Sequence, residues 1–321
     1  MSKEAEMHRR GMRMARRVVI KVGTPVVTHV DGNLALGRIG ALVEQVARLR
    51  QEGRDVCLVT SGAISTGSLR MRRAMSLKVP LGSTMGKDKK DNEGEMNISG
   101  AAAVGQSLLI NLYEVLLTKY NLSCAQVLIT EDDLKDADTL SQICETTTEL
   151  MKLGTIPIIN DNDAVTSRSV PVYDKSTNEV MWDNDVLASQ IAVNMRADLL
   201  IMLTDLDALY AESPAGRGGE PVRLSTYDPE AKLVRSGITS GQLLLSDEGR
   251  GAFANRTRMA EQSMRALVDA SRNAVTGGVR AAVVTTGHHP LSLVHTLRGD
   301  DIGTLFYAEG SVPQAPLTSK L

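Results

Sequence analysis

Short apolar runs alternate along the chain with segments whose apolar residues recur every three or four positions, the periodicity of a helix with one buried face. The runs predict strands over residues 18–22, 56–60, 125–129, 156–159, 199–203 and 281–285. The periodic segments predict helices over residues 39–49, 101–120, 139–153, 186–195 and 257–274. This alternation is typical of an α/β protein, a three-layer α/β/α sandwich with a mainly parallel central sheet. Such sheets bind ligands at the carboxyl ends of their strands.

Two segments fall outside this alternation. Residues 71–100 are charged and interrupted by glycine and proline, and they predict an insertion loop. A solvated loop is the simpler interpretation of this segment, and a lid over a site is the alternative. Residues 1–16 form a basic N-terminal arm, which we expect to be exposed to solvent. Glu4 and Glu6 argue against a mitochondrial presequence, which is poor in acidic residues.

The end of the chain matches a known targeting signal. Residues 308–321 are polar and predict an exposed tail that ends in Ser319, Lys320 and Leu321. This tripeptide is the signal that the peroxisomal import receptor recognises. We therefore expect the protein in a peroxisome or a related microbody such as a glycosome, with the cytoplasm as the second choice.

Composition narrows the classes of function. There are 36 Lys and Arg residues against 38 Asp and Glu residues, and a net charge of −2 argues against nucleic-acid binding through a general basic surface. No apolar run approaches the roughly 18 residues of a membrane span. The three cysteines are too scattered for a disulfide framework or a zinc cluster. The 321 residues suffice for one large α/β domain or two small ones, and we expect no bound nucleic acid, no membrane segment and no cluster of metal ligands.

Candidate chemistry follows the first two expected strands. Lys21 and Gly23 end the first strand, and a lysine beside a glycine at the carboxyl edge of a sheet suits an anion. The second strand ends in Ser61, Gly62 and Ala63, a tight turn that would expose backbone N–H groups at the start of a helix. Each motif alone is weak, because surface lysines and small turns are common in α/β proteins.

Denser polar clusters come later in the chain. Residues 160–163 read N-D-N-D directly after a strand, and residues 182–185 read W-D-N-D directly before a helix. An Asx residue before a helix is often only an N-cap. Together the clusters offer groups for a polar zwitterion, or carboxylates for a metal. Thr204 and Asp205 end the next strand, where they would hold the base and ribose of a nucleotide or merely cap a turn.

Familiar phosphate motifs do not fit this chain. Gly82 and Gly86 precede Lys87, but three residues separate the glycines where a P-loop has four, and Asp88 stands where Ser or Thr is required. No G-x-G-x-x-G follows an expected strand, which argues against a Rossmann dinucleotide enzyme.

The chain contains, in this order, the motifs V-I-K-V-G-T, V-T-S-G-A, A-A-V-G-Q, N-D-N-D, W-D-N-D, L-T-D-L-D-A-L-Y and G-D-D-I-G-T-L-F. This ordered set resembles that of the amino acid kinase family, and within it that of the glutamate 5-kinases. The resemblance runs from about Val18 to Phe306. It implies ATP-dependent phosphorylation of the γ-carboxylate of L-glutamate, the first step of proline synthesis, with Mg²⁺, in a homodimer or homotetramer. It also implies one kinase domain over residues 17–307, with a glutamate-binding N-lobe over about 17–197 and an ATP-binding C-lobe over about 198–307.

The resemblance also implies a role for each motif residue. Lys21 would contact the transferring phosphates with Gly23 as a backbone donor beside it, and Asp185 would orient the lysine and the magnesium-bound phosphates. The residues that would bind glutamate are Ser61, Gly62, Ala63, Asp163 and Asn184. The residues that would bind the nucleotide are Thr204, Asp205, and Arg256 or Arg258.

Three departures from the family pattern bear on the function. Asp161 replaces a glutamate, Ala208 replaces a glycine, and residues 249–259 lack the family's second ATP-contacting lysine, for which Arg256 or Arg258 would substitute. A carboxylate acceptor is already ionised, so the reaction needs no histidine or cysteine base. Two alternatives are a related enzyme acting on another carboxylate or a carbamate, and a non-catalytic subunit that senses an amino acid.

Overall fold

The computed structural model describes residues 2–78, 98–166, 184–213, 220–231, 233–234 and 250–308. Side chains are not described for residues 75–78, 234 and 250–262. Residues 309–321, with the tripeptide Ser319–Leu321, lie outside the described part, so the targeting signal stays a prediction.

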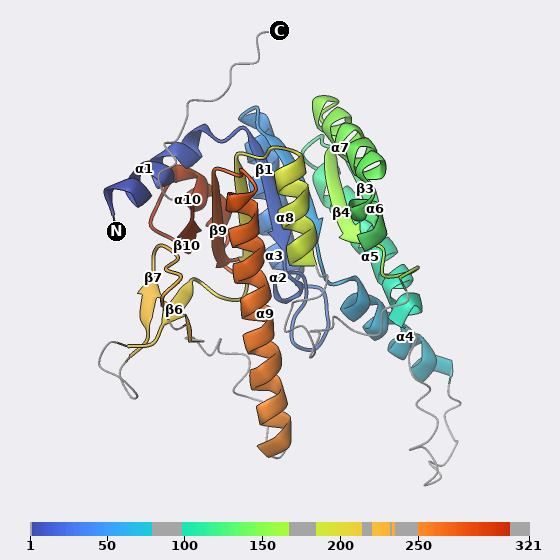
Figure 1. Cartoon of the computed structure of the whole chain (residues 1–321). Helices are drawn as coiled ribbons and strands as arrows, with labels where there is room; N and C mark the ends of the chain where they lie inside the picture. Colours follow the sequence, from blue (N-terminus) through green and yellow to red (C-terminus); the bar gives the residue numbers. More distant parts are fainter. Residues whose placement is uncertain are drawn as a thin grey trace.

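A seven-stranded sheet forms the centre of the molecule, in the order β10-β9-β5-β1-β2-β4-β3 (Figure 1). Its strands are β1 (Arg17–Val22), β2 (Asp55–Thr60), β3 (Cys124–Ile129), β4 (Ile156–Asp161), β5 (Leu199–Thr204), β9 (Ala281–Thr286) and β10 (Thr304–Phe306). Neighbouring strands run parallel except β10, which is antiparallel to β9. The six expected strands and the mainly parallel sheet are confirmed.

A small second sheet stands at one side, in the order β7-β6-β8 (Figure 1). It consists of β6 (Leu209–Ala211), β7 (Val222–Leu224) and β8 (Leu233–Val234). Its strands and β10 were not expected, because runs of two or three residues carry no readable periodicity.

Helices cover both faces of the central sheet. The helices are α1 (Lys3–Gly11), α2 (Thr24–Val27), α3 (Leu36–Gln51), α4 (Ala63–Lys78), α5 (Ile98–Thr118), α6 (Glu131–Lys135), α7 (Ala137–Lys152), α8 (Asn184–Asn194), α9 (Arg250–Thr276) and α10 (Ser292–Arg298), with a 3₁₀ turn at Met12–Met14. In Figure 1, α8 and α9 lie in front of the sheet and α3 behind it. The fold is therefore a three-layer α/β/α sandwich, as expected.

Two aliphatic cores separate these layers. On one face Ile20 and Val22 of β1 pack among side chains of α3, α5 and α10. On the other face Val19 packs among side chains of α7, α8 and α9. Because side chains alternate along a strand, Lys21 shares the α8 side with Val19.

Helix α5 is apolar enough over its 21 residues to resemble a membrane span. Its Leu109, Tyr113 and Leu117 are at most 2% exposed and pack in the core beneath α3. Packing within the domain therefore accounts for these three residues of α5, whereas Val104 and Val115 are exposed.

The insertion loop expected over residues 71–100 is shorter than predicted at both ends. Residues 71–78 continue α4, and residues 98–100 form the first turn of α5. No glycine or proline interrupts residues 69–79, so nothing in that stretch ends the helix. Residues 79–97 lie outside the described part of the chain.

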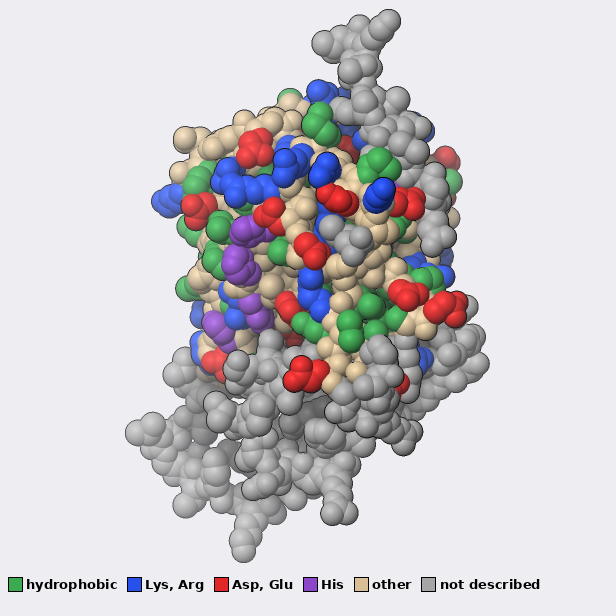
Figure 2. Space-filling view, turned by 90° about the vertical axis from the view of Figure 1, so that its left-hand side faces the viewer, with side chains coloured by type: hydrophobic (Ala, Val, Ile, Leu, Met, Phe, Trp, Pro, Cys, Tyr) green, Lys and Arg blue, Asp and Glu red, His purple; other side chains and the backbone are tan. Residues whose placement is uncertain are grey.

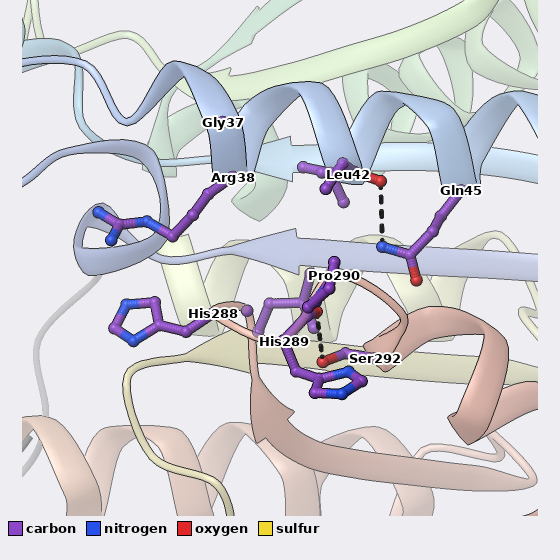
Figure 3. A pocket seen from close by; sticks show the side chains of 11 residues that line it. Gly37, Arg38, Leu42, Gln45, His288, His289, Pro290 and Ser292 are labelled. Atoms are coloured by element: carbon purple, nitrogen blue, oxygen red, sulfur yellow. Dashed lines mark hydrogen bonds between the residues drawn. The ribbon is translucent and has the colours of Figure 1, made fainter.

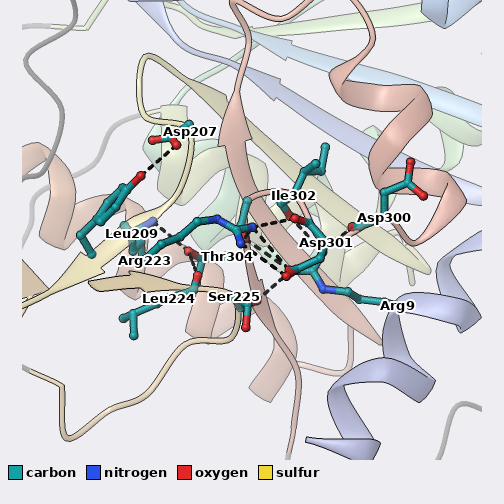
Figure 4. Close-up of polar contacts among 12 residues, drawn as sticks. Arg9, Asp207, Leu209, Arg223, Leu224, Ser225, Asp300, Asp301, Ile302 and Thr304 are labelled. Atoms are coloured by element: carbon teal, nitrogen blue, oxygen red, sulfur yellow. Dashed lines mark hydrogen bonds and ion pairs between the residues drawn. The ribbon is translucent and has the colours of Figure 1, made fainter. Parts of the chain in front are cut away.

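The expectation of a solvated N-terminal arm is wrong. Residues 3–11 form α1, which packs beside α10 (Figure 1). The Arg9 side chain is 1% exposed, and its guanidinium donates hydrogen bonds to the carbonyls of Asp300 and Ile302 at 2.9 Å and of Ser225 at 2.7 Å (Figure 4). Asp301 contributes a carboxylate oxygen 3.2 Å from the same group. These three carbonyl partners of Arg9 lie between 216 and 293 residues further along the chain, and a charge pattern in sequence does not reveal them.

Replacing Arg9 with methionine is expected to lower the free energy of unfolding by about 3 kcal/mol, because four carbonyls, that of Gly303 included, lose a buried donor that water does not replace. Urea unfolding followed by circular dichroism measures the effect. Arg10→Met is the matched control, since Arg10 lies in the same helix and pairs only at the surface with Glu6. Equal unfolding midpoints for the two variants would show that the Arg9 contacts do not stabilise the domain.

Candidate functional site

The carboxyl ends of β1, β2, β4 and β5 meet at one edge of the sheet, because these strands are neighbours and parallel. Lys21 of β1 is 8% exposed, and its Nζ lies 2.6 Å from Oδ1 of Asp185, which is 7% exposed. Asp185 comes from the first turn of α8. Water screens a pair this buried only weakly, so the carboxylate fixes the direction in which the lysine points. Two residues that are far apart in sequence thus form one charged centre.

Gly23 directly follows β1 and keeps this centre open. Its N–H donates to the carbonyl of Leu203 at 2.9 Å, so it is already engaged and does not have the free donor that the resemblance implies. The missing side chain is what matters here. A Cβ at this position would lie 3.0 Å from the Leu203 carbonyl oxygen and 3.6 Å from Lys21 Nζ. We therefore correct the role of Gly23 from donor to clearance beside the lysine.

The turn after β2 lies next to this centre. The Ser61 N–H donates to the Val22 carbonyl at 2.9 Å, which joins the end of β2 to the end of β1. Gly62 has φ = +98°, a conformation that other residues rarely adopt, and Ala63 begins α4. Ser61 is 8% exposed and Ala63 is 2% exposed. The three residues of the predicted turn are thus brought to the same edge as Lys21.

Asn184 joins the two polar clusters of the sequence. Its Oδ1 accepts a 3.3 Å hydrogen bond from the Asp161 N–H, and its Nδ2 donates to Asn160 Oδ1 at 3.4 Å. Asp163 lies half-buried in the turn that follows β4. The N-D-N-D motif and the start of α8 therefore belong to one region. Trp182 and Asp183 lie outside the described residues.

Sequence reasoning assigned no role to the individual residues of A-A-V-G-Q, yet α5 contacts both the end of β4 and the turn after β2. Gln106 is 5% exposed, and its Nε2 donates to the Asp161 carbonyl at 3.0 Å. A Cβ on Gly105 would lie 1.8 Å from the Ala63 carbonyl oxygen, so α5 approaches this turn closely. A glycine inside a helix costs about 1 kcal/mol of stability relative to alanine. The glycine at position 105 was therefore the one feature of the sequence that could have indicated a close contact of α5.

A third contact from α5 reaches the end of β2. The Tyr113 hydroxyl lies 3.2 Å from Thr60 Oγ1. Tyr113 is 1% exposed, and burial raises the pKa of its phenol to about 12. This tyrosine therefore stays neutral and acts as a support rather than as an acid or base.

Thr204 and Asp205 occupy the other side of Lys21, at the end of β5. Thr204 Oγ1 donates to Asp205 Oδ1 at 3.0 Å, and the Thr204 carbonyl accepts from the Gly287 N–H at 2.8 Å. Arg256 and Arg258 lie in α9, which begins seven residues before the expected start at Thr257, and their side chains are not described. The contact of Arg256 or Arg258 with a nucleotide therefore stays a prediction.

The centre holds no poised base or thiol nucleophile among the described residues. Cys57 of β2 is fully buried, and burial raises the pKa of its thiol to about 12, so it stays protonated. Figure 2 shows histidine side chains gathered on one face of the molecule. His8 stacks on Tyr307 with 4.4 Å between the ring centroids, and the rings of His289 and His295 lie 5.5 Å apart.

The described residues contain no group of three or more His, Cys, Asp or Glu side chains placed to hold a metal ion. Among the described residues, Asp185 supplies the buried carboxylate in contact with Lys21. Mg²⁺ typically binds one or two carboxylates together with the phosphates of a substrate. This donor set fits Mg²⁺ that arrives with a nucleotide and does not form a metal cage by itself.

Sequence comparison places the chain among known proteins. Residues 16–286 match the model of the amino acid kinase family. A glutamate 5-kinase from Symbiobacterium thermophilum is 36% identical over 304 residues, which cover 94% of this chain and all of that protein. A delta-1-pyrroline-5-carboxylate synthase from Solanum lycopersicum is 36% identical over 296 residues, which cover 92% of this chain. The chain spans only 38% of the length of that synthase.

Structural comparison supports the fold. A UMP kinase from Bacillus anthracis superimposes with a TM-score of 0.52 at 11% identity, covering 92% of this chain and 97% of the kinase. The extent of the family match, the identity to relatives over nearly the whole chain and the parallel sheet agree. The chain belongs to the amino acid kinase family.

Proposed function

We propose that the protein transfers the γ-phosphoryl group of ATP to the γ-carboxylate of L-glutamate. The observation that carries the proposal is the buried Lys21–Asp185 pair, which stands between the Ser61 turn and Thr204 at the carboxyl edge of the sheet. The identity to a glutamate 5-kinase over that protein's full length supports the choice of glutamate as acceptor.

The reaction requires alignment rather than acid–base catalysis. A carboxylate oxygen of glutamate attacks the γ-phosphorus, the bond from that phosphorus to the bridging oxygen breaks, and ADP leaves with the electron pair. No proton moves in this step, because the acceptor is already ionised. Both reactants are anions, so a fixed positive charge at the point of transfer lowers the barrier.

Lys21 supplies that charge in this proposal, and Asp185 holds its ammonium group in place. When Mg²⁺ is bound with the nucleotide, it neutralises phosphate charge, and Asp185 is the described carboxylate nearest to Lys21 that would face it. The burial of the pair excludes water, which would otherwise screen the lysine and hydrolyse the acyl phosphate.

The two sides of the centre would bind the two substrates. On the β2 and β4 side, the turn at Ser61 and the polar groups of Asp163 and Asn184 would bind the glutamate ammonium and carboxylate groups. On the β5 side, Thr204 and Asp205 would lie against the nucleotide, with the charge of Arg256 or Arg258 near its phosphates. Lys21 on β1 lies between these sides, because β1 separates β2 from β5 in the sheet.

The direct test is a coupled assay of ADP release by the purified protein with Mg-ATP and L-glutamate. Hydroxylamine in a parallel sample should trap the acyl phosphate as a hydroxamate, which distinguishes phosphorylation of a carboxylate from simple ATP hydrolysis. We expect glutamate to be preferred over aspartate, N-acetylglutamate and carbamate. Preference for another acceptor would assign the protein to a different branch of the family.

A second function is favoured by one departure from the family pattern. Residues 249–259 contain no lysine, so the second cationic contact to ATP, besides Lys21, would have to come from an arginine. A non-catalytic subunit that senses an amino acid would bind glutamate or proline in calorimetry but would bind no ATP. Binding of both glutamate and Mg-ATP, without turnover, would instead indicate that a component of the assay is missing.

A further inference from the structure

The short helix α2 directly follows the Lys21 strand, and its carbonyl end is bonded to two distant side chains. His288 lies within hydrogen-bond distance of the Pro25 carbonyl, with 3.1 Å between Nε2 and the oxygen. Arg38 donates from Nε to the Val26 carbonyl at 3.0 Å and from Nη2 to the Thr28 carbonyl at 2.8 Å. The last carbonyls of a helix have no partner within the helix, so these side chains satisfy groups that would otherwise depend on water.

The two side chains come from opposite directions. Arg38 lies in the first turn of α3, whereas His288 follows β9 (Figure 3). Burial lowers the pKa of the Arg38 guanidinium, yet an arginine stays charged at neutral pH, and a cation at the carbonyl end of a helix is favourable. A carbonyl only accepts hydrogen bonds, so His288 must carry its proton on Nε2 to bond Pro25.

The β9 end of this contact also touches the nucleotide side. Gly287 approaches α2 so closely that a Cβ there would lie 2.4 Å from Val26 Cγ2. The Gly287 N–H donates to the Thr204 carbonyl. One short loop therefore joins α2 to the residue that, in the proposed function, lies against ATP.

A cavity of about 250 Å³ separates α3 from the loop after β9, and Arg38 and His288 both line it (Figure 3). Arg38 bonds α2 from the α3 side of this space, and His288 bonds it from the side of the loop after β9. Each bond limits the movement of the segment that follows Lys21.

We infer that Arg38 and His288 are positioning residues: they hold residues 23–28 and so keep Lys21 aligned for phosphoryl transfer. Neither side chain touches the reacting groups. The inference rests on the proposed function, because it assigns the alignment of Lys21 to a catalytic purpose.

Kinetics of Arg38→Met, His288→Phe and the double variant test the inference. We expect the double variant to lose about tenfold in kcat, since a small misplacement of a catalytic group has effects of this size or larger. The KM for glutamate should rise by a smaller factor than kcat falls, because α2 meets the glutamate side through the packing of Val27 beside Gly62, which neither substitution removes. His288→Gln, which restores a donor, should recover most of the rate lost in His288→Phe.

Matched controls separate positioning from general damage. His289→Phe changes a histidine that lines the same cavity but bonds only the Leu291 N–H. Arg48→Met changes an exposed arginine of the same helix, α3, that pairs with Glu52. Both controls should keep the wild-type kcat, and a wild-type kcat in the double variant would overturn the inference.

Hydrogen–deuterium exchange gives a readout that does not depend on activity. The N–H groups of Val26 and Val27 donate to the Gly23 carbonyl, and that of Thr28 donates to the Thr24 carbonyl. These amides should exchange faster in Arg38→Met than in wild type or Arg48→Met, and unchanged exchange would overturn the inference. Faster exchange in a protein that phosphorylates no carboxylate would retain the anchoring of α2 and refute the proposed function instead.

Discussion

Replacing Lys21 with methionine is expected to lower kcat by about a thousandfold, while the KM for glutamate changes by less than about threefold. Methionine keeps much of the volume of the lysine stem but removes the charge that lies 2.6 Å from Asp185. Glutamate binds on the β2 and β4 side in the proposed function, so its affinity depends little on this ammonium group. Steady-state kinetics with saturating Mg-ATP measures the change in kcat and the change in the KM for glutamate separately.

The control for this prediction addresses stability. Lys21→Met leaves the Asp185 carboxylate buried without its cation, which destabilises a fold by roughly 3–5 kcal/mol. The double variant Lys21→Met with Asp185→Asn removes both charges and should regain stability without regaining activity. Wild-type kcat in either folded variant would refute the role of Lys21.

Replacing Gly105 with alanine is expected to destabilise the domain by about 3 kcal/mol and to raise the KM for glutamate. The new Cβ would lie 1.8 Å from the carbonyl oxygen of Ala63, and backbone atoms cannot rotate away as a flexible side chain does. Relief requires α5 to move away from the turn that begins at Ser61. Chemical unfolding and glutamate kinetics on the same preparation measure the two effects.

Gly40→Ala is the matched control for this substitution. Gly40 lies inside α3, and a Cβ there would have no atom within 4 Å. Alanine is the better helix former, so this variant should be unchanged or more stable by up to about 1 kcal/mol. If Gly105→Ala behaves like Gly40→Ala, α5 does not need its close approach to Ala63.

Periodicity predicts the repeating part of this fold and little of its arrangement. The pattern of residues 39–49 predicts α3, because one buried face repeats over several turns. The strand order β5-β1-β2-β4 is not readable from the same pattern, since buried parallel strands look alike in sequence. The docking of α1 cannot be predicted from periodicity for another reason. A charged residue such as Arg9 is normally expected at the surface, and only the folded structure shows the carbonyl groups that let it be buried.

The candidate site divides in a similar way. Lys21 and Asp185 were expected to act together on the basis of motif resemblance, and the structure places them in contact. The engaged N–H of Gly23 and the bond from Gln106 to Asp161 depend on strand pairing and helix packing, which no motif spells out. Arg38 and His288 carry no motif signal at all, because their partners are backbone carbonyls.

The contact between Arg9 and residues 300–303 also bears on how the chain folds during synthesis. The guanidinium meets carbonyls up to 293 positions further along, among the last to leave the ribosome in this domain. At roughly 5–20 residues per second, α1 waits about 15–60 s before its docking site exists. The contacts of Arg9 with these carbonyls therefore form only after almost the whole domain has been synthesised. Contacts between residues so far apart in sequence slow folding.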